Sequence, residues 1–420
     1  MNDLLKNCCK AKLTCIKRRN STKEKILDAA FTLYKTPRFK DISLQEVADS
    51  CGITKAAIFR HYKSKDDLIQ AMNSRFVDVT CPYFKALKGL DNFTEIFTKV
   101  FSFFVEHFEY LAFFMTELLR PGEFENRLYQ EFKKRSISTV YQVFDDNAIV
   151  KNKEAYVTII YAFISVLFMS FNFAHTHVKN LDKDGLPDFH SITQEEIQKL
   201  SENIYQLLKS GSKEIGDIKS DRKTELEKLV EISDSELPEE NKIFSALAFV
   251  IHNYGFMGVT VERVASELGL AKSSLYTYFS DKSTMMKELI SDELVQMINY
   301  INTKSASGKT YSEKIYLHMF SQLEYFIHRK SLLPVMSWVS LQENMDMKKN
   351  HNKENSIKKF INEKVQKTEG ALTLDDDKVV WISMLPIALM VQGMKHGFKV
   401  SELKWHLRNL FGMITGGIKI

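Results

Sequence analysis

The feature that most constrains this sequence is a segment that occurs twice. Residues 26–72 and 243–289 match without a gap at a constant offset of 217. The stretch at 39–62 reads FKDISLQEVADSCGITKAAIFRHY, and its counterpart at 256–279 reads FMGVTVERVASELGLAKSSLYTYF. Self-similarity in one register over this length indicates a duplicated structural unit. We therefore expect the chain to build the same small fold twice.

Each copy has the pattern of three short helices. The second helix of the first copy begins with Ser43-x-x-Glu46, the sequence of a capping box, and Thr260 replaces Ser43 in the second copy. Gly52 follows this helix, and glycine can adopt the left-handed conformation that a tight turn between helices needs. A third helix is expected over 54–62. The pattern predicts a helix-turn-helix, whose second helix enters the major groove of DNA.

A second interpretation is a pair of helical hairpins with no special function. It does not explain why two segments so far apart keep the same turn glycine and the same two lysines, Lys55 and Lys65 in the first copy. We therefore favour the helix-turn-helix for both copies.

The end of each copy carries a recognisable motif. It reads FRHYKSKD at 59–66 and YTYFSDKS at 276–283, an aromatic pair followed by a polar turn, a lysine and an acidic or polar residue. Both copies resemble the DNA-binding domain of the tetracycline-repressor (TetR) family. The resemblance implies an all-α chain of two tandem TetR-like units, each an N-terminal helix-turn-helix domain followed by a helical ligand-binding or dimerisation domain.

The resemblance also assigns DNA contacts. Thr54, Lys55 and Ala56 open the first recognition helix, where lysine can donate to guanine, threonine can bond either way and alanine can touch a thymine methyl. His61 and Lys65 stand where the family contacts phosphates. The implied DNA-binding residues are Thr22, Ser43, Thr54, Lys55, Ala56, Arg60, His61 and Lys65 in the first copy, and Thr260, Lys272, Ser273, Thr277, Tyr278 and Lys282 in the second. Four apolar residues beside them are expected in the core instead: Phe59, Tyr62, Leu275 and Phe279.

The two copies differ in charge. Residues 1–70 hold 15 Lys and Arg against 8 Asp and Glu, a net charge of +7, whereas residues 238–290 hold 5 against 6, a net charge of −1. Neutralisation of phosphates dominates the strength of DNA binding. The first copy is therefore expected to bind DNA more strongly. The second copy either grips a different, weaker half-site, which we favour, or has drifted into a structural role.

Length and composition bound the rest of the chain. At 420 residues it is too long for one compact core, and its net charge of +5 permits a nucleic-acid partner without requiring one. We expect a basic flexible arm (1–20), the first helix-turn-helix domain (21–72), a first helical sensor or dimerisation domain (73–211), a charged linker (212–237), the second helix-turn-helix domain (238–290) and a second sensor or dimerisation domain (291–420). An odd number of cysteines, 5, without a secretory signal favours the cytoplasm.

Two features of the sensor halves bear on function. The stretch at 93–114 is dense in aromatic residues, and an apolar effector pocket could use some of them: Phe97, Phe101, Phe104 and Phe108. The run at 155–174 carries no charge and is long enough to span a membrane, but its polar residues recur every seven positions and no basic cluster flanks it. We therefore expect a helix buried in protein.

These patterns predict a sequence-specific transcriptional regulator, most simply a repressor, that binds double-stranded DNA and responds to a small apolar effector. A single chain with both heads suggests an intramolecular pseudo-dimer, with a homodimer as the other assembly. The alternative is a helical partner-binding or membrane-associated protein in which the helix-turn-helix units are structural. The sequence contains no phosphate-binding loop, no nucleophile elbow and no HExxH motif, so we expect neither an enzyme, nor a metal site, nor a cofactor.

Overall fold

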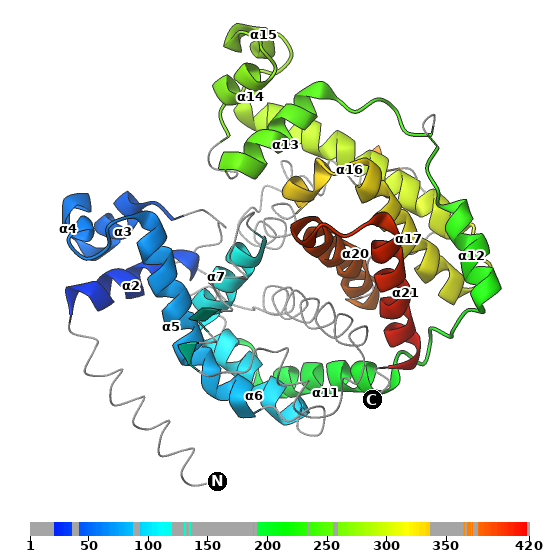
Figure 1. Ribbon diagram of the computed structural model, residues 1–420, viewed down its shortest axis with the longest axis horizontal. Helices are drawn as coiled ribbons and strands as arrows, with labels where there is room; N and C mark the ends of the chain where they lie inside the picture. Colours follow the sequence, from blue (N-terminus) through cyan, green and yellow to red (C-terminus); the bar gives the residue numbers. More distant parts are fainter. Residues whose placement is uncertain are drawn as a thin grey trace. The chain divides into compact units, whose positions relative to one another are not determined.

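The computed structural model describes residues 21–35, 42–86, 93–119, 130–131, 134–135, 188, 191–233, 236–254, 259–336, 364–365, 368–370, 372 and 377–417. These residues form helices joined by turns and loops, with no strand among them, which confirms the predicted all-α fold class. They group into two compact units: unit 1 is Met1–Ile149 with His177–Ser201, and unit 2 is Val150–Thr176 with Glu202–Ile420 (Figure 1). Each unit contains one copy of the repeated segment.

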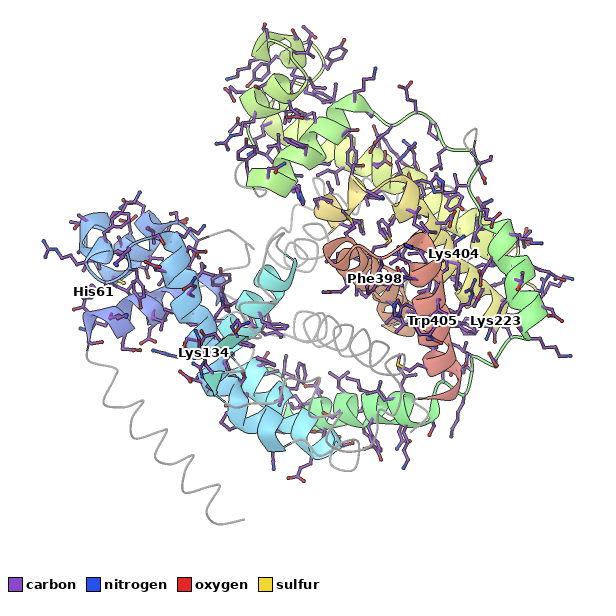
Figure 2. The ribbon with its side chains drawn as sticks, in the orientation of Figure 1. His61, Lys134, Lys223, Phe398, Lys404 and Trp405 are labelled. Atoms are coloured by element: carbon purple, nitrogen blue, oxygen red, sulfur yellow. The ribbon has the colours of Figure 1, made fainter. Side chains whose placement is uncertain are left out.

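The first copy folds into a three-helix domain that we call the first head. Its elements are α2 (Thr22–Thr32), η1 (Leu33–Lys35), α3 (Leu44–Cys51) and α4 (Lys55–Phe59). Ile26, Val47 and Ile58 are fully buried and form its core. Gly52 ends α3 with φ at 66°, the left-handed conformation expected from the sequence. The predicted helix-turn-helix is therefore present, and His61 lies just beyond its recognition helix α4 (Figure 2).

A long helix, α5 (Lys65–Ala86), leads from the first head into the body of unit 1. Arg75 of α5 donates to Asp28 Oδ1 of α2 at 3.0 Å and also pairs with Glu24. One arginine therefore ties the first helix of the head to the helix that leaves it.

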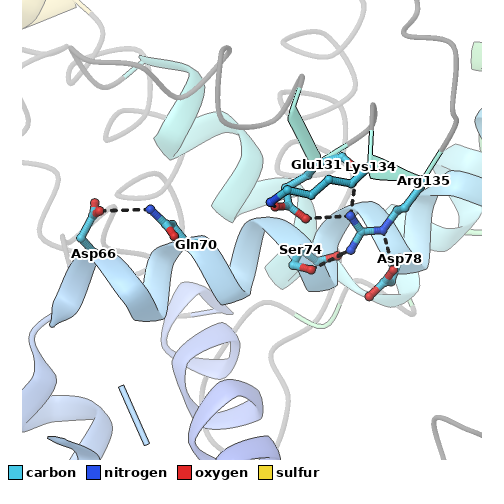
Figure 3. A network of polar contacts seen from close by, with 7 residues as sticks. All are labelled: Asp66, Gln70, Ser74, Asp78, Glu131, Lys134 and Arg135. Atoms are coloured by element: carbon cyan, nitrogen blue, oxygen red, sulfur yellow. Dashed lines mark hydrogen bonds and ion pairs between the residues drawn. The ribbon is translucent and has the colours of Figure 1, made fainter. Parts of the chain in front are cut away.

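A second arginine covers the next part of α5. Arg135 donates to Asp78 at 2.7 Å, to the Ser74 hydroxyl at 2.6 Å and to Glu131 at 2.7 Å (Figure 3). Its guanidinium thereby joins Glu131 and Arg135 to α5 through charge-assisted hydrogen bonds. Burial opposes its charged form, but the hydrogen bonds that Arg135 donates to Asp78 and Glu131 prevail and raise the pKa of Arg135.

The body of unit 1 has an aromatic core. Its remaining helices are α6 (Phe93–Glu106), α7 (Phe108–Leu119) and the first part of α11 (Gln194–Ser210). Phe76 of α5 stacks on Phe104 with ring centroids 6.4 Å apart. Phe31 of the first head packs on two rings of α7, Tyr110 at 4.5 Å and Phe113 at 5.3 Å. The head and the body of unit 1 therefore share one continuous apolar core.

The predicted effector pocket falls in this region. Phe101, Phe104 and Phe108 are buried, each at most 2% exposed. Phe97 belongs to α6, but its side chain lies outside the described part of the structure. These rings contribute to the core, and their role in an effector pocket stays a prediction.

Unit 2 carries the second head, built in the same way. Its helices are α13 (Lys242–Tyr254), α14 (Val261–Glu267) and α15 (Lys272–Tyr276). Val264, Ala265 and Leu275 are at most 1% exposed and fill the core. Gly269 has φ at 68°, matching Gly52 of the first head. The two sequence copies thus fold alike down to the turn.

The body of unit 2 surrounds a central helix. Its helices are α12 (Ser220–Leu229), α16 (Lys282–Ala306), α17 (Tyr311–His328), α20 (Asp377–His396) and α21 (Val400–Gly416). α17 packs against α12, α16, α20 and α21, so it is buried along most of its length. Lys404 of α21, labelled in Figure 2, pairs with the buried Glu324 of α17 at 3.3 Å.

The segment predicted as a charged linker contains α12, which is docked on unit 2 by two paired charges. Arg222 donates to both carboxylate oxygens of Glu313 at 2.8 and 3.2 Å. Arg408 donates in the same two-pronged way to Glu227 at 2.7 and 2.6 Å, and the Tyr316 hydroxyl donates to that carboxylate as well. Such bidentate pairs fix orientation as well as distance, so this helix is held against α17 and α21.

The end of α11 also belongs to unit 2, because the boundary between the units falls after Ser201 within this helix. Its last turn meets the end of α21. The Ser212 N–H donates to the Ile414 carbonyl at 2.6 Å. Gly211 has φ at +70°, and a Cβ there would lie 2.5 Å from the Thr415 carbonyl carbon. Only glycine fits this backbone-to-backbone contact.

This contact generates a stability prediction. We expect Gly211→Ala to destabilise unit 2 by about 1–2 kcal/mol for the left-handed backbone and by roughly a further 1–3 kcal/mol for the clash. Gly397→Ala is the matched control, because Gly397 also has a positive φ, 66°, but nothing lies within 4 Å of its Cβ position. Differential scanning calorimetry of both variants measures the difference, and equal losses would show that the contact is loose.

Unit 2 buries a histidine in its core. His318 of α17 is 5% exposed, and its Nε2 lies 2.7 Å from the Ser383 hydroxyl of α20. Its Nδ1 has no hydrogen-bond partner within the described residues. Burial lowers the pKa of His318 from 6.5 to about 4. The ring is therefore neutral at physiological pH.

This burial makes the stability of unit 2 depend on pH. The pKa of the folded state lies below that of the unfolded state, so the unfolded chain binds more protons between pH 6.5 and about 4. The stabilisation is complete above pH 6.5 and is lost on acidification to about pH 4, about 3 kcal/mol in all. Urea unfolding of the parent and of His318→Gln at several pH values isolates this contribution. A difference between the two that does not change with pH would contradict it.

Two expectations fall on residues that the structure does not describe: the basic arm at 1–20 and the uncharged run at 155–174. Within the described ranges, no helix has the length and apolar character needed to cross a membrane. Nor does any group of three or more His, Cys, Asp or Glu there come close enough to hold a metal ion.

Candidate nucleic-acid interface

The first recognition helix presents polar residues on a buried support. Thr54 caps α4, its hydroxyl accepting the Ala57 N–H at 3.2 Å. Lys55 and Ala56 follow it and are exposed, while Ile58 of the same helix is fully buried. One face of this short helix therefore anchors it, and the opposite face is open to a partner.

The exposed side of the first head is basic. Lys55, Arg60, His61 and Lys63 are exposed, and no ion pair engages any of the three Lys and Arg among them in the part of the chain that the structure describes. Their charges face solvent at the end of the head, where a polyanion would find them uncompensated.

The residues expected to contact phosphates at the starts of α2 and α3 make different hydrogen bonds. Ser43 forms a complete capping box with Glu46: its hydroxyl accepts the Glu46 N–H at 3.2 Å, and Glu46 accepts the Ser43 N–H at 3.0 Å. Ser21, and not Thr22, caps α2, which leaves the exposed Thr22 side chain in its first turn. The Ser43 hydroxyl keeps its proton as a donor for a phosphate.

The support beneath the recognition helix contains one departure from the expected core. Tyr62 is buried, 3% exposed, and its hydroxyl donates to the Lys23 carbonyl at 3.2 Å. Leu275 is buried as expected and Phe279 is half-buried. The prediction was wrong for Phe59, which is 45% exposed, as is its counterpart Tyr276. Each ring belongs to the last residue of its recognition helix and is exposed to solvent.

The second recognition helix has different chemistry. Ala271 stands at the cap position and makes no side-chain hydrogen bond. The Thr277 hydroxyl donates to the Ser274 carbonyl at 2.6 Å, so its proton is engaged within the head. Tyr278 is 71% exposed in the place of His61. The exposed surface is therefore more aromatic and less basic than that of the first head.

Two further residues of this head are placed by the structure. Ser273 is exposed beside Lys272 on the open face of α15. Thr260 caps α14, accepting the Arg263 N–H at 3.2 Å. Lys282 is half-buried at the start of α16, and burial lowers its pKa.

The lysine that both recognition helices share differs in its surroundings. Lys272 forms an ion pair with Glu262 of α14, and its Nζ also lies 5.6 Å from the centre of the Tyr276 ring. The hydrogen bond between Lys272 and Glu262 lowers the pKa of Glu262 and raises that of Lys272. The sequence patterns did not predict this pair. Its signal is a difference between the two copies, because Gln45 stands at the position where the second copy has Glu262.

Comparison with known proteins bears directly on this geometry. The family model described as bacterial regulatory proteins, tetR family, matches residues 26–72 and 243–289, the same two segments that fold into the heads. Both heads are tetR-family domains. The chain thus carries two tetR-type units in tandem, and members of this family are DNA-binding regulators and not enzymes.

Two curated relatives extend the comparison. The chain is 25% identical over 120 residues to an uncharacterized HTH-type transcriptional regulator, YerO, of Bacillus subtilis (strain 168); the match covers 26% of this chain and 40% of the relative. It is 22% identical over 158 residues to the biofilm operon icaADBC HTH-type negative transcriptional regulator IcaR of Staphylococcus aureus (strain Newman), covering 36% of this chain and 85% of the relative. The chain spans less than half of the YerO relative's length.

The unequal tetR-type heads generate a prediction for DNA binding. We expect Lys55→Ala to weaken binding by about 1–3 kcal/mol and to lower the salt dependence, because an uncompensated lysine is lost. Lys272→Ala should cost less, since this lysine already has an intramolecular partner. Fluorescence anisotropy on one duplex across a salt series measures both losses. Equal losses for the two lysines would contradict the proposed inequality of the heads.

Proposed function

We propose that the chain is a cytoplasmic, sequence-specific transcriptional repressor in which one polypeptide supplies both heads of a pseudo-dimer. The observation that carries this proposal is the presence of two complete tetR-type heads with unlike recognition helices in one chain. Proteins with helix-turn-helix heads bind two half-sites about 34–36 Å apart with a pair of heads. This chain has such a pair without a second copy.

The proposed operator has two different half-sites. Thr54, Lys55 and Ala56 open one recognition helix, whereas Ala271, Lys272 and Ser273 open the other. The first helix has a hydroxyl residue before the lysine and an alanine after it, and the second helix has the reverse order. A hydroxyl and a methyl group select different base edges. An identical pair of half-sites would serve only one of them well.

The pseudo-dimer is supported by how the second half ends. α20 and α21 are the two closing helices of the chain, and the last turn of α11, the closing helix of the first half, packs on the end of α21 within unit 2.

Control by a small effector is supported by the packing of the first head. Phe31 of α2 lies against Tyr110 and Phe113 of α7, and Arg75 of α5 holds the other side of α2. A shift of α7 would therefore displace the first head. An effector changes DNA affinity only as far as it binds one of these arrangements more tightly than the other.

Repression is the sign of control that we favour, since the IcaR relative is named as a negative regulator. A bound repressor acts by occupying its operator, and neither head needs chemistry beyond binding for that.

Selection from random duplex DNA, followed by footprinting and light scattering, tests the proposal. We expect one selected site with two unlike halves, both protected, and the mass of one chain per duplex. A palindromic site occupied by two chains would overturn the pseudo-dimer, and failure to retain any duplex at low salt would overturn DNA binding itself.

A further inference from the structure

We infer that Glu262 sets how strongly the second head engages DNA, by holding Lys272 of the recognition helix in an ion pair. The inference rests on the proposed function and adds a residue outside the recognition helix that tunes one head. It makes the second head's contribution to DNA affinity dependent on a carboxylate that the first head lacks.

The geometry places the pair where DNA would lie. Glu262 is the second residue of α14 and Lys272 the first residue of α15, so the pair spans the two helices of the helix-turn-helix. Both side chains are about half exposed, 56% and 48%. The Tyr276 ring, one turn along α15, lies 5.6 Å from the ammonium group and adds a second attraction on the protein side.

The first head lacks this arrangement. Gln45 occupies the position of Glu262, and its amide donates to Asp49 Oδ1 of its own helix at 2.8 Å. Lys55 therefore has no carboxylate from that position facing it. The two heads share the lysine and differ in its partner.

The acidic residue in the first turn of the helix stands one position earlier in the second head than in the first. This shift accounts for the different partner of the shared lysine. In the first head Glu46 folds back on Ser43 and completes the capping box. In the second head Arg263 takes that position and lies over the Tyr254 ring at 4.7 Å, so the acid stands one residue earlier. Glu262 does not form a capping box with Thr260, and besides hydrogen bonds to its own N–H and to the Thr260 side chain its carboxylate reaches Lys272.

The energetic effect appears on DNA and not in the free protein. An exposed ion pair contributes little to the stability of the folded protein. On DNA, the same carboxylate occupies the lysine and also faces phosphates of like charge. Each phosphate that a lysine neutralises adds about 0.9 to the salt dependence of binding. The second head should therefore bind with a shallower salt dependence than its lysine content suggests.

Reciprocal exchange of the two aligned residues tests the inference. Glu262→Gln gives the second head the residue of the first, and Gln45→Glu does the reverse. On a duplex that carries both selected half-sites, we expect Glu262→Gln to bind roughly 3- to 10-fold more tightly, with a salt dependence steeper by about 0.9, and Gln45→Glu to change both in the opposite direction. Footprinting should assign the first change to the second half-site.

A double-mutant cycle separates the ion pair from simple repulsion. In a Lys272→Ala chain, the gain from Glu262→Gln should fall to a small fraction of its value in the parent. An equal gain in both backgrounds would show that Glu262 acts on DNA by itself and would overturn the inference. Thermal melting of each variant checks folding, which these exposed positions should leave unchanged.

The outcomes also separate the inference from the function on which it rests. If the parent binds duplex DNA and Glu262→Gln changes neither affinity nor salt dependence, the inference alone is overturned. If neither the parent nor any variant binds duplex DNA, the proposed function is overturned together with it.

Discussion

Each recognition helix in this protein has five residues, too few to persist as a helix in water. Its shape comes from the packing beneath it, where one buried residue per helix, Ile58 or Leu275, seats it on the rest of the head. The left-handed glycines Gly52 and Gly269 set the direction in which the chain enters that helix. The orientation of every exposed side chain on the recognition helix therefore depends on this buried residue and on the glycine turn before it.

The two heads share this architecture but are attached differently. In unit 1, Arg75 of α5 holds α2 through Asp28 and Glu24. In unit 2 the aligned position is Asp292, which pairs with Lys364 instead. The first head is therefore clamped to its exit helix by a cation, whereas among the described residues no such pair joins Asp292 to α13. The heads share the helix-turn-helix scaffold, and they have diverged both on the exposed face of the recognition helix and where they meet their own bodies.

The sequence predicted the parts of the fold that depend on local chemistry. The capping box at Ser43, the cap at Thr260 and the turn at Gly52 follow from short-range patterns, and all three are present. The sequence failed where the outcome depends on packing between segments. Phe59 has the character of a core residue but lies on the open side of a short helix whose buried side Ile58 already fills. The roles of the candidate DNA contacts stay predictions, because exposure shows that a side chain is accessible and not what it binds.

The charged stretch at 212–237 shows the same limit more clearly. Its composition is typical of a linker, yet α12 within it is docked by two arginine–carboxylate pairs whose partners lie 91 and 181 residues away in sequence. No local pattern marks Arg222 or Glu227 as docked, since the partner defines the role. The ion pair of Lys272 with Glu262 is a short-range example: it needs the turn between the helices to bring the two residues together.

Encoding the two heads separately changes what a substitution does. In a symmetric dimer every substitution is made twice, so a change that suits one half of the binding site is imposed on the other as well. Here Gln45 and Glu262 can mutate independently, as can Thr54 and Ala271. The sequence of one half-site can therefore change, with a matching substitution in one head, while the other head still binds its own half-site. A duplicated chain can in this way come to recognise asymmetric sequences that a symmetric dimer cannot.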